Sequence, residues 1–424
     1  MSTNNLPIKF YSFLISIIPI VLITGPFLPD LFLVIVGIGY LGLTYREKEF
    51  LDFSNLYLKL FFFVCIYLII LSIVSLNFDS FKSSIFYFRF GLFSLALSFF
   101  VFQNPKIIKN LLYIFIIVYF TLFIDTIYQF FYSKNIIGFE YSNPQNFRIT
   151  SFFGDDEVLG SYTARFFPLF LFLILYSYKL SISKKAHVMI SLVTIISFVI
   201  VLMSGERTSL ALFILVFSFI FFSSKNFRKV LFIPLISIVI VFILTVSLSD
   251  KIKNRVLTQT MDQMGLSSKS ERLVIFSKTY EGHYLLALKM FKEKPIFGHG
   301  PKMFRFYCSK EENKEENFVV NHACSTHPHN FYAQVLAETG IIGLFILLGI
   351  FIYISFLFFK NLYFQIIKKQ QLISDMAICL LASYFMTLFP FIPSGNFFNN
   401  WLSVIVYFPL GFLLYTIKEK KFYV

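Results

Sequence analysis

Long apolar runs separated by short polar segments are the dominant pattern of the chain. The runs are roughly 17 to 25 residues long, which is enough for a helix to cross the hydrocarbon layer of a membrane. Continuous apolarity over such a length is typical of a transmembrane helix. The pattern predicts an all-α, polytopic integral membrane protein with about twelve transmembrane helices. The predicted spans are residues 8–25, 27–45, 56–76, 84–102, 107–131, 157–178, 186–204, 207–223, 229–248, 341–359, 372–390 and 401–417.

The composition agrees with this class and excludes two others. Hydrophobic residues make up 57% of the 424 residues and charged residues only 14%. A soluble domain would be about one-quarter charged, and a disordered chain would be poor in apolar residues. The first apolar run is followed by further runs and by no small-residue cleavage pattern, so we expect a span there rather than a removable signal.

The positions of the basic residues predict the orientation. The net charge is +14, but most Lys and Arg lie in short loops between apolar runs rather than on one soluble face, which argues against a nucleic-acid binder. Cytoplasmic loops are enriched in Lys and Arg. One alternating set of short loops holds eighteen of them and the other set four. Both termini are therefore expected in the cytoplasm.

Three regions follow from the spans. Residues 1–248 are expected to hold spans one to nine, and residues 341–424 spans ten to twelve. Between them, residues 249–340 form one large loop on the outer side, with 13 basic and 10 acidic residues up to position 339. Apolar residues recur at helical spacing over residues 270–294, which predicts an amphipathic helix that ends near Pro295.

Arg207 stands out because basic residues are scarce on the outer side. It lies in the turn SGERTS between the seventh and eighth spans. An arginine there can simply reach the lipid head groups. Its planar guanidinium is also suited to hold a phosphate in a two-pronged contact, and the helix start that follows favours anions.

A second cluster, CSTHPHNFYAQVLAETG, occupies residues 324–340. Proline is favoured at the first position of a helix, so Pro328 predicts a helix that begins there and runs into the tenth span. His329 would lie in its first turn, where a positive charge is disfavoured. A neutral imidazole at that position can accept a proton, although a lone histidine in a loop can also be a plain surface residue.

Two other sets of residues have competing interpretations. His322, His327 and His329 could bind zinc, but their spacing matches no standard zinc pattern and nothing completes four ligands. Charged groups inside spans are costly, so they are expected to pair with one another. Asp125 could pair with one of the two arginines that lie within spans, Arg89 and Arg165.

The motifs resemble those of the O-antigen ligase and polymerase superfamily of bacterial envelope glycosyltransferases. The resemblance rests on HNFYAQVLAETGI, in which His-Asn is followed after nine residues by Gly and an aliphatic residue. Three further stretches agree: SGERTSLALFIL at 204–215, the stretch from SERLVIF to GPKMF at 270–304, and FRITSFFGDDEVLGSY at 147–162. With twelve spans and one large outer loop before the tenth, the resemblance covers most of the chain.

The resemblance implies transfer of a glycan from undecaprenyl pyrophosphate to an acceptor hydroxyl at the periplasmic face of the inner membrane, without metal or other cofactor. It implies that His329 is the base and that Arg207 and Arg272 hold the departing pyrophosphate. The weaker candidates for substrate contacts are Arg148, Arg305, His327 and Asn330.

The acceptor leaves two reactions open. A ligase would transfer the glycan to lipid A-core, and a polymerase would transfer it to a second lipid-linked unit; the compact loop and the motifs favour the ligase. A different class is a transporter of lipid-linked glycans, which usually shows paired halves with broken helices at the membrane midplane. No similarity between the two halves is visible in this sequence.

Cys308 and Cys324 are the two cysteines outside the predicted spans, and both lie in the outer loop. The bacterial periplasm is oxidising, so we expect a disulfide between them. It would close a loop of about 16 residues and restrict the unfolded loop by roughly 3 kcal/mol.

The loop between spans nine and ten should be accessible from the periplasm. In cells with a permeabilised outer membrane, the variant Lys314→Cys should react with a membrane-impermeant thiol reagent, because long loops translocate largely regardless of their charge. Labelling that requires lysis of the inner membrane would contradict the predicted topology.

Overall fold

A computed structural model of the chain describes residues 6–46, 56–140, 147–178, 183–266, 274, 278–310 and 324–424. In these ranges the chain is helical, with only two isolated β-bridges. Ten of the described helices are long and apolar enough to cross a membrane. The protein is an all-α polytopic membrane protein.

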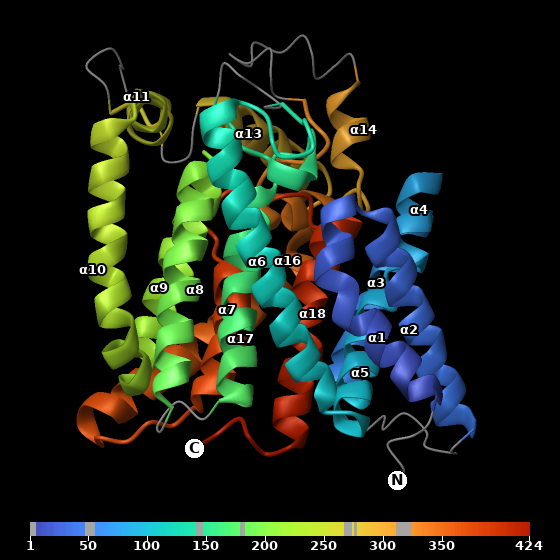
Figure 1. The fold of residues 1–424 in the computed structure, drawn as a ribbon. Coiled ribbons are helices and arrows are strands. Elements are labelled where there is room, and N and C mark those ends of the chain that lie inside the picture. Colours follow the sequence, from blue (N-terminus) through green and yellow to red (C-terminus); the bar gives the residue numbers. More distant parts are fainter. Residues whose placement is uncertain are drawn as a thin grey trace.

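A bundle of roughly antiparallel helices forms the body of the molecule (Figure 1). In chain order it contains α1 (Leu6–Val21) with η1 (Leu22–Thr24), α2 (Phe27–Arg46), α3 (Leu56–Val74), α4 (Phe78–Ile85), α5 (Phe88–Gln103), α6 (Lys106–Tyr132), α7 (Leu159–Ser177), α8 (Lys184–Met203), α9 (Arg207–Ser223), α10 (Lys225–Leu248), α16 (Phe331–Ile367), α17 (Asp375–Thr387) and α18 (Asn400–Lys418).

Each of the twelve predicted spans overlaps one of these helices over most of its length. α1 reaches the length of a span together with η1, and α5 does so together with α4. Two other helices stay shorter, α9 with 17 residues and α17 with 13. α17 begins late because Ser374 caps it, accepting a hydrogen bond from the Ala377 N–H. It ends before Pro390, which cannot donate a backbone hydrogen bond. That these two helices cross the membrane stays a prediction.

Short helices gather at one end of the bundle, opposite the start of α1 and the end of α18 (Figure 1). They belong to the predicted outer loop, apart from η2 (Ser151–Phe153) after α6. The others are α11 (Asp250–Lys253), the π-helical turn η3 (Asn254–Thr258), α12 (Gln259–Gln263), α13 (Lys278–Glu293) and α14 (Phe304–Cys308). α13 corresponds to the predicted amphipathic helix and ends, as predicted, just before Pro295.

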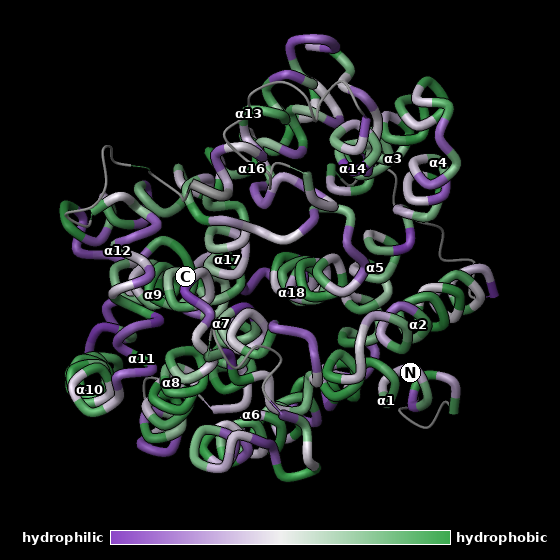
Figure 2. The backbone as a smooth tube through the Cα atoms, turned by 90° about the horizontal axis from the view of Figure 1, so that it is seen from above, coloured by the Kyte–Doolittle hydropathy of each residue, from purple (hydrophilic) through white to green (hydrophobic). Residues whose placement is uncertain are grey.

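α7 lies at the centre of the bundle and is buried on nearly all sides (Figure 2). Aromatic side chains fill the space around it. Phe166 packs edge-to-face on Phe115 of α6 with ring centroids 5.3 Å apart, and Phe172 lies 5.4 Å from Phe412 of α18. Such pairs add to the burial of their large apolar surfaces. The outer helices differ: Ile233 and Ile243 of α10 are 69% and 56% exposed, as expected of side chains that face lipid.

The charged groups within the bundle find partners that the sequence did not indicate. Arg89 forms a salt bridge of 2.7 Å with Asp30 of α2. Asp125 accepts hydrogen bonds from the Ser151 hydroxyl and the Ile136 N–H, and not from an arginine of the described residues. The predicted pairing of Asp125 with an arginine is therefore wrong, because the segment after α6 folds back onto its carboxylate.

The segment after α13 is hydrogen-bonded to a kink in α16. Gly340 has φ 65° and ψ −166°, a conformation nearly restricted to glycine. A Cβ atom there would lie 2.2 Å from the Ile296 carbonyl oxygen. The Gly300 N–H donates to the Glu338 carbonyl at 2.8 Å, and the Ile341 N–H to the Pro295 carbonyl at 2.9 Å. The kink thus accommodates the segment that follows α13.

The variant Gly340→Ala should be markedly less stable, because a side chain at this backbone conformation costs about 1–3 kcal/mol and would also collide with Ile296. Gly349→Ala in the same helix is the matched control, since a Cβ atom there meets nothing within 4 Å. Thermal unfolding of both variants in detergent measures the difference. Equal midpoints for the two variants would contradict this role of Gly340.

Candidate functional site

His329 lies just before α16 and not inside its first turn, as the sequence predicted. The helix begins at Phe331, and the Asn330 side chain caps it by accepting hydrogen bonds from the N–H groups of Tyr332 and Ala333. Asn330 also donates to the Pro390 carbonyl at 2.8 Å. The prediction was wrong because it assigned the helix start to Pro328, whereas the stronger asparagine cap two residues later sets it.

The backbone of His329 is held in the left-handed region, with φ 55°. Its carbonyl accepts a hydrogen bond of 2.9 Å from the Ser394 N–H, which ties it to the segment before α18. A residue other than glycine persists in this conformation only where its surroundings hold it there. The hydrogen bond to Ser394 and the neighbouring Asn330 cap therefore hold the backbone of His329, and with it the direction of its half-buried side chain.

Three aromatic rings surround the His329 imidazole. The ring centroid of His327 lies 4.1 Å away, that of Tyr280 5.1 Å and that of His283 5.2 Å. Burial, with a smaller contribution from His283, lowers the pKa of His329 to about 4. The imidazole is therefore neutral near pH 7, as expected, but burial rather than a helix dipole is the main cause. A neutral ring nitrogen can accept a proton.

His327 is the closest neighbour and is itself poorly satisfied. Burial and, to a smaller extent, the neighbouring His329 lower its pKa to about 3. Its Nδ1 atom lies 3.0 Å from the Thr326 hydroxyl. Its buried Nε2 atom has no hydrogen-bond partner in the part of the chain that the structure describes.

Arg207 is the first residue of α9, and Glu206 before it fixes the turn. The buried Glu206 carboxylate accepts hydrogen bonds from the N–H groups of Gly160 and Ser161 at the start of α7, at 2.6 and 3.1 Å. It also accepts one from the Ser209 hydroxyl at 2.7 Å. The Arg207 guanidinium donates to Gln263 at 2.6 Å. Glu206 therefore joins the start of α7 to the start of α9, next to Arg207.

Arg255 joins Arg207 and Arg148 in a group that we call the arginine cluster. Arg255 is 5% exposed and donates to the Gly205 carbonyl at 3.0 Å. Burial and, to a smaller extent, the neighbouring Arg148 and Arg207 lower its pKa to about 10. Arg255 remains protonated near pH 7. Its electrostatic neighbours Arg148 and Arg207 are also guanidinium groups, so three positive charges lie close together. Arg148 is partly neutralised by its ion pair with Glu157.

Tyr280 connects this cluster with the histidines. Its ring packs on His329, and it is an electrostatic neighbour of Arg255. A proton acceptor and a group of cations thus lie on two sides of one tyrosine. Such an arrangement can accept a proton from one reactant and stabilise negative charge that develops on another.

Gly205 allows the close approach on which the arginine cluster depends. It has φ +68°, and a Cβ atom there would lie 2.4 Å from the Phe147 carbonyl oxygen. Phe147 belongs to the segment that carries Arg148. The turn of Arg207 therefore packs directly on the segment of Arg148.

Arg305 lies on α14. It is an electrostatic neighbour of His327. Arg272 and His322 lie outside the described residues, so their places stay predictions. Although His283, His327 and His329 lie together, the described residues contain no group of three or more His, Cys, Asp or Glu side chains placed to hold a metal ion.

A disulfide joins Cys308 at the end of α14 to Cys324, with Cα atoms 5.1 Å apart. This is the pair that the sequence predicts. The other two cysteines, Cys65 and Cys379, are free and buried in the bundle. The bond ties α14 to the segment that carries His327 and His329.

Residues 192–348 match the model of the O-antigen ligase family. Through this region the chain is similar to the O-antigen ligase superfamily. The match runs from α8 to the first half of α16 and includes Arg207, Arg255 and His329. It indicates an enzyme of the O-antigen ligase or polymerase type in the inner membrane. No curated protein matches the chain.

The O-antigen ligase motifs pointed to His329 and Arg207, but several residues around them were missed. Glu206 offered a signal, since an acidic residue in a tight turn between apolar runs needs a partner. Arg255 and His283 offered none, because each becomes part of the site only when the outer segments fold over the bundle. Their neighbours in the sequence are ordinary polar and apolar residues of a loop and a helix.

Natively purified protein should contain two free thiols. Titration under denaturing, non-reducing conditions should detect only Cys65 and Cys379, and reduction beforehand should raise the number to four. The oxidising periplasm favours the bond. Four thiols without reduction would contradict the disulfide.

Proposed function

We propose that the protein is an O-antigen ligase-type glycosyltransferase, which moves a glycan from undecaprenyl pyrophosphate to a hydroxyl of lipid A-core. The observation that carries the proposal is the position of Tyr280 between His329 and the arginine cluster, within the region that matches the family. The reaction needs both parts: a base for the hydroxyl and cations for the leaving group.

In this reaction a bond forms between the acceptor oxygen and the anomeric carbon of the donor sugar. The bond from that carbon to the pyrophosphate oxygen breaks. The acceptor proton passes to the neutral His329 imidazole, and the electron pair leaves on undecaprenyl pyrophosphate. Arg207 and Arg255 would stabilise the negative charge of the leaving group, together with Arg272 as the resemblance implies. No step requires a metal or other cofactor.

The remaining candidates have supporting roles in this proposal. Arg148 adds positive charge near Arg255, and His327 would contact the substrate beside His329. Asn330 acts as a positioning residue, because its side chain caps α16 and contacts the Pro390 carbonyl. The site would face the periplasm, with both termini in the cytoplasm. The helices of the outer loop lie at one end of the bundle, and the start of α1 and the end of α18 lie at the other, which is consistent with this topology (Figure 1).

Transfer in vitro with rival acceptors tests the proposed function. Purified protein is supplied with a defined lipid-linked repeat unit as donor, and either lipid A-core or a second lipid-linked unit as acceptor. A glycan on lipid A-core is the expected product. Product on the lipid-linked unit alone would make the protein a polymerase, and no product with either acceptor would overturn both assignments.

His329→Ala should reduce transfer by about 10² to 10⁴, because it removes the base that activates the hydroxyl. Donor binding should persist. Arg207→Lys should also fail, since a point charge cannot replace a two-pronged contact with pyrophosphate. His327→Ala and His322→Ala should have milder effects, and chelators should have none. Initial rates in membranes at matched expression measure each variant.

Matched controls come from exposed residues at the other end of the bundle. His187→Ala and Arg46→Lys repeat the two substitutions at exposed positions in α8 and α2. Both should transfer at the wild-type rate. Wild-type transfer by His329→Ala, or inhibition by a chelator that zinc reverses, would count against the proposed site.

A further inference from the structure

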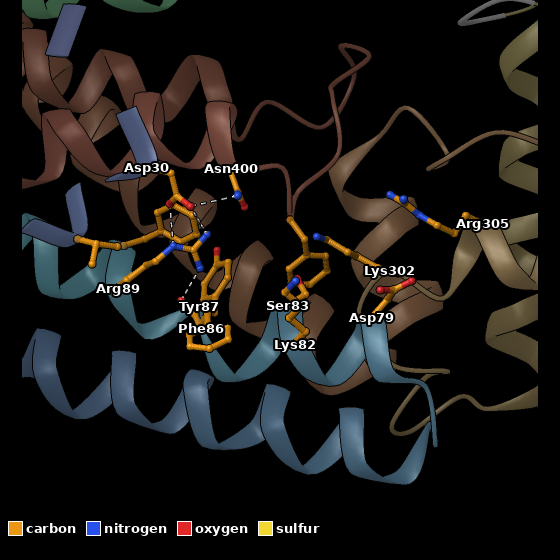
Figure 3. Close-up of a pocket in the computed structure, with 13 residues that line it drawn as sticks. Asp30, Asp79, Lys82, Ser83, Phe86, Tyr87, Arg89, Lys302, Arg305 and Asn400 are labelled. Atoms are coloured by element: carbon orange, nitrogen blue, oxygen red, sulfur yellow. Dashed lines mark hydrogen bonds and ion pairs between the residues drawn. The ribbon is translucent and has the colours of Figure 1, made fainter. Parts of the chain in front are cut away.

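A cavity of about 480 Å³ lies between α4, α5 and the segment 302–305, outside the arginine cluster (Figure 3). We call it the Lys302 cavity. Its volume is in the range of sites for small ligands. Its charged lining residues are four basic and two acidic side chains: Lys82, Arg89, Lys302, Arg305, Asp30 and Asp79.

The two walls of the cavity differ in charge. On one wall, Arg89 donates to both carboxylate oxygens of Asp30, at 2.7 and 3.2 Å, and Asn400 donates to Asp30 at 3.3 Å. This wall is internally neutralised. On the other side, Lys302 and Arg305 extend toward the cavity from the segment before α14 and from its start (Figure 3). Lys82 also lines it, and Asp79 is the one acidic lining residue outside the Asp30 pair. A net positive charge therefore remains.

The backbone that carries the basic side chains is fixed, but one of their hydrogen-bond donors has no acceptor among the described residues. The Lys302 backbone has φ 61°, and its N–H donates to the Glu338 carboxylate at 3.0 Å. The Arg305 Nε atom is buried and has no hydrogen-bond partner among the described residues. A buried donor without a partner is costly, so an anion that accepts a hydrogen bond from it would bind favourably.

The Lys302 cavity adjoins the proposed catalytic histidines. Arg305 is an electrostatic neighbour of His327, and the Phe304 ring lies 6.5 Å from the His283 ring. Seen from above, α9 and α12 lie on one side of α16, and α14 and α4 lie on the other (Figure 2). The histidines thus adjoin both basic regions, the arginine cluster through Tyr280 and the Lys302 cavity through Arg305.

We propose that the Lys302 cavity binds a phosphate group of the acceptor, through Lys82, Lys302 and Arg305. This inference rests on the proposed function, in which the donor pyrophosphate occupies the arginine cluster. A reaction between two lipid-linked molecules needs a separate position for each. The acceptor phosphate has two possible sources: a phosphorylated sugar of lipid A-core, or the pyrophosphate of a second lipid-linked unit.

Binding to the full chain in detergent tests the inference without requiring transfer. The probes are a phosphorylated core oligosaccharide, the same oligosaccharide after removal of its phosphates, and a lipid-linked repeat unit, each titrated by calorimetry. Wild-type protein should bind the phosphorylated probe at least about tenfold more tightly than the dephosphorylated one, since a charge-assisted hydrogen bond contributes about that factor. If the acceptor is a second lipid-linked unit instead of the core, wild-type protein should bind the lipid-linked unit more tightly than variants of the Lys302 cavity do.

The variants Lys302→Gln and Arg305→Gln should abolish this preference. Lys82 lines the cavity from α4. The variant Lys82→Gln should reduce the same preference, so it tests the inference even if Arg305→Gln does not fold. The matched control is Lys292→Gln, an exposed lysine on α13 outside both basic regions. In transfer assays the cavity variants should raise the KM for the acceptor at least about tenfold and leave the KM for the donor unchanged.

The outcomes separate this inference from the proposed function. Loss of affinity for the core oligosaccharide assigns the cavity to lipid A-core, and loss for the lipid-linked unit assigns it to a polymerase acceptor. Cavity variants that bind the phosphorylated oligosaccharide and the lipid-linked unit like wild type would overturn the inference, even if glycan transfer is normal. Absence of transfer by wild-type protein would overturn the proposed function, while the binding data would still decide whether the cavity recognises phosphate.

Discussion

The buried carboxylate of Glu338 accepts hydrogen bonds from the N–H groups of Lys302 and Phe304, both at 3.0 Å, and from the Gln334 side chain at 3.1 Å. A carboxylate that is fully removed from solvent must have such partners, because an unsatisfied one is strongly destabilising. Gln334 in turn donates to Asn396 at 3.0 Å. One side chain therefore joins α16, the start of α14 and the segment before α18.

This junction determines how the proposed reactants are arranged. His329 lies at one end of the helix that carries Glu338, and Lys302 lies on the segment that the carboxylate holds. Neither can move far without breaking a buried hydrogen bond, so the distance between the histidines and the Lys302 cavity is set by backbone contacts. Gly340 serves the same purpose, because a Cβ atom at this position would lie 2.2 Å from the Ile296 carbonyl oxygen.

Sequence patterns predicted the bundle well because a membrane imposes a length and a composition on each span. The His-Asn motif and the turn of Arg207 could also be found, since each is a local departure from that pattern. Partnerships across the fold could not. Arg89 and Asp30 are 59 residues apart, and nothing local distinguishes this pairing from one with Asp125. The start of α16 was misplaced because two helix-start signals, Pro328 and Asn330, compete within three residues.

That competition has a physical consequence for His329. If the helix began at Pro328, the imidazole would project from a helical turn and the Asn330 side chain could not cap the N–H groups of Tyr332 and Ala333. With the cap at Asn330, His329 takes a left-handed backbone conformation and its carbonyl bonds to the Ser394 N–H. The residue is then fixed from two segments, with its ring among Tyr280, His283 and His327. Burial among these rings, rather than the dipole of α16, keeps the imidazole neutral. The cap therefore fixes both where the proposed base lies and which protonation state it has.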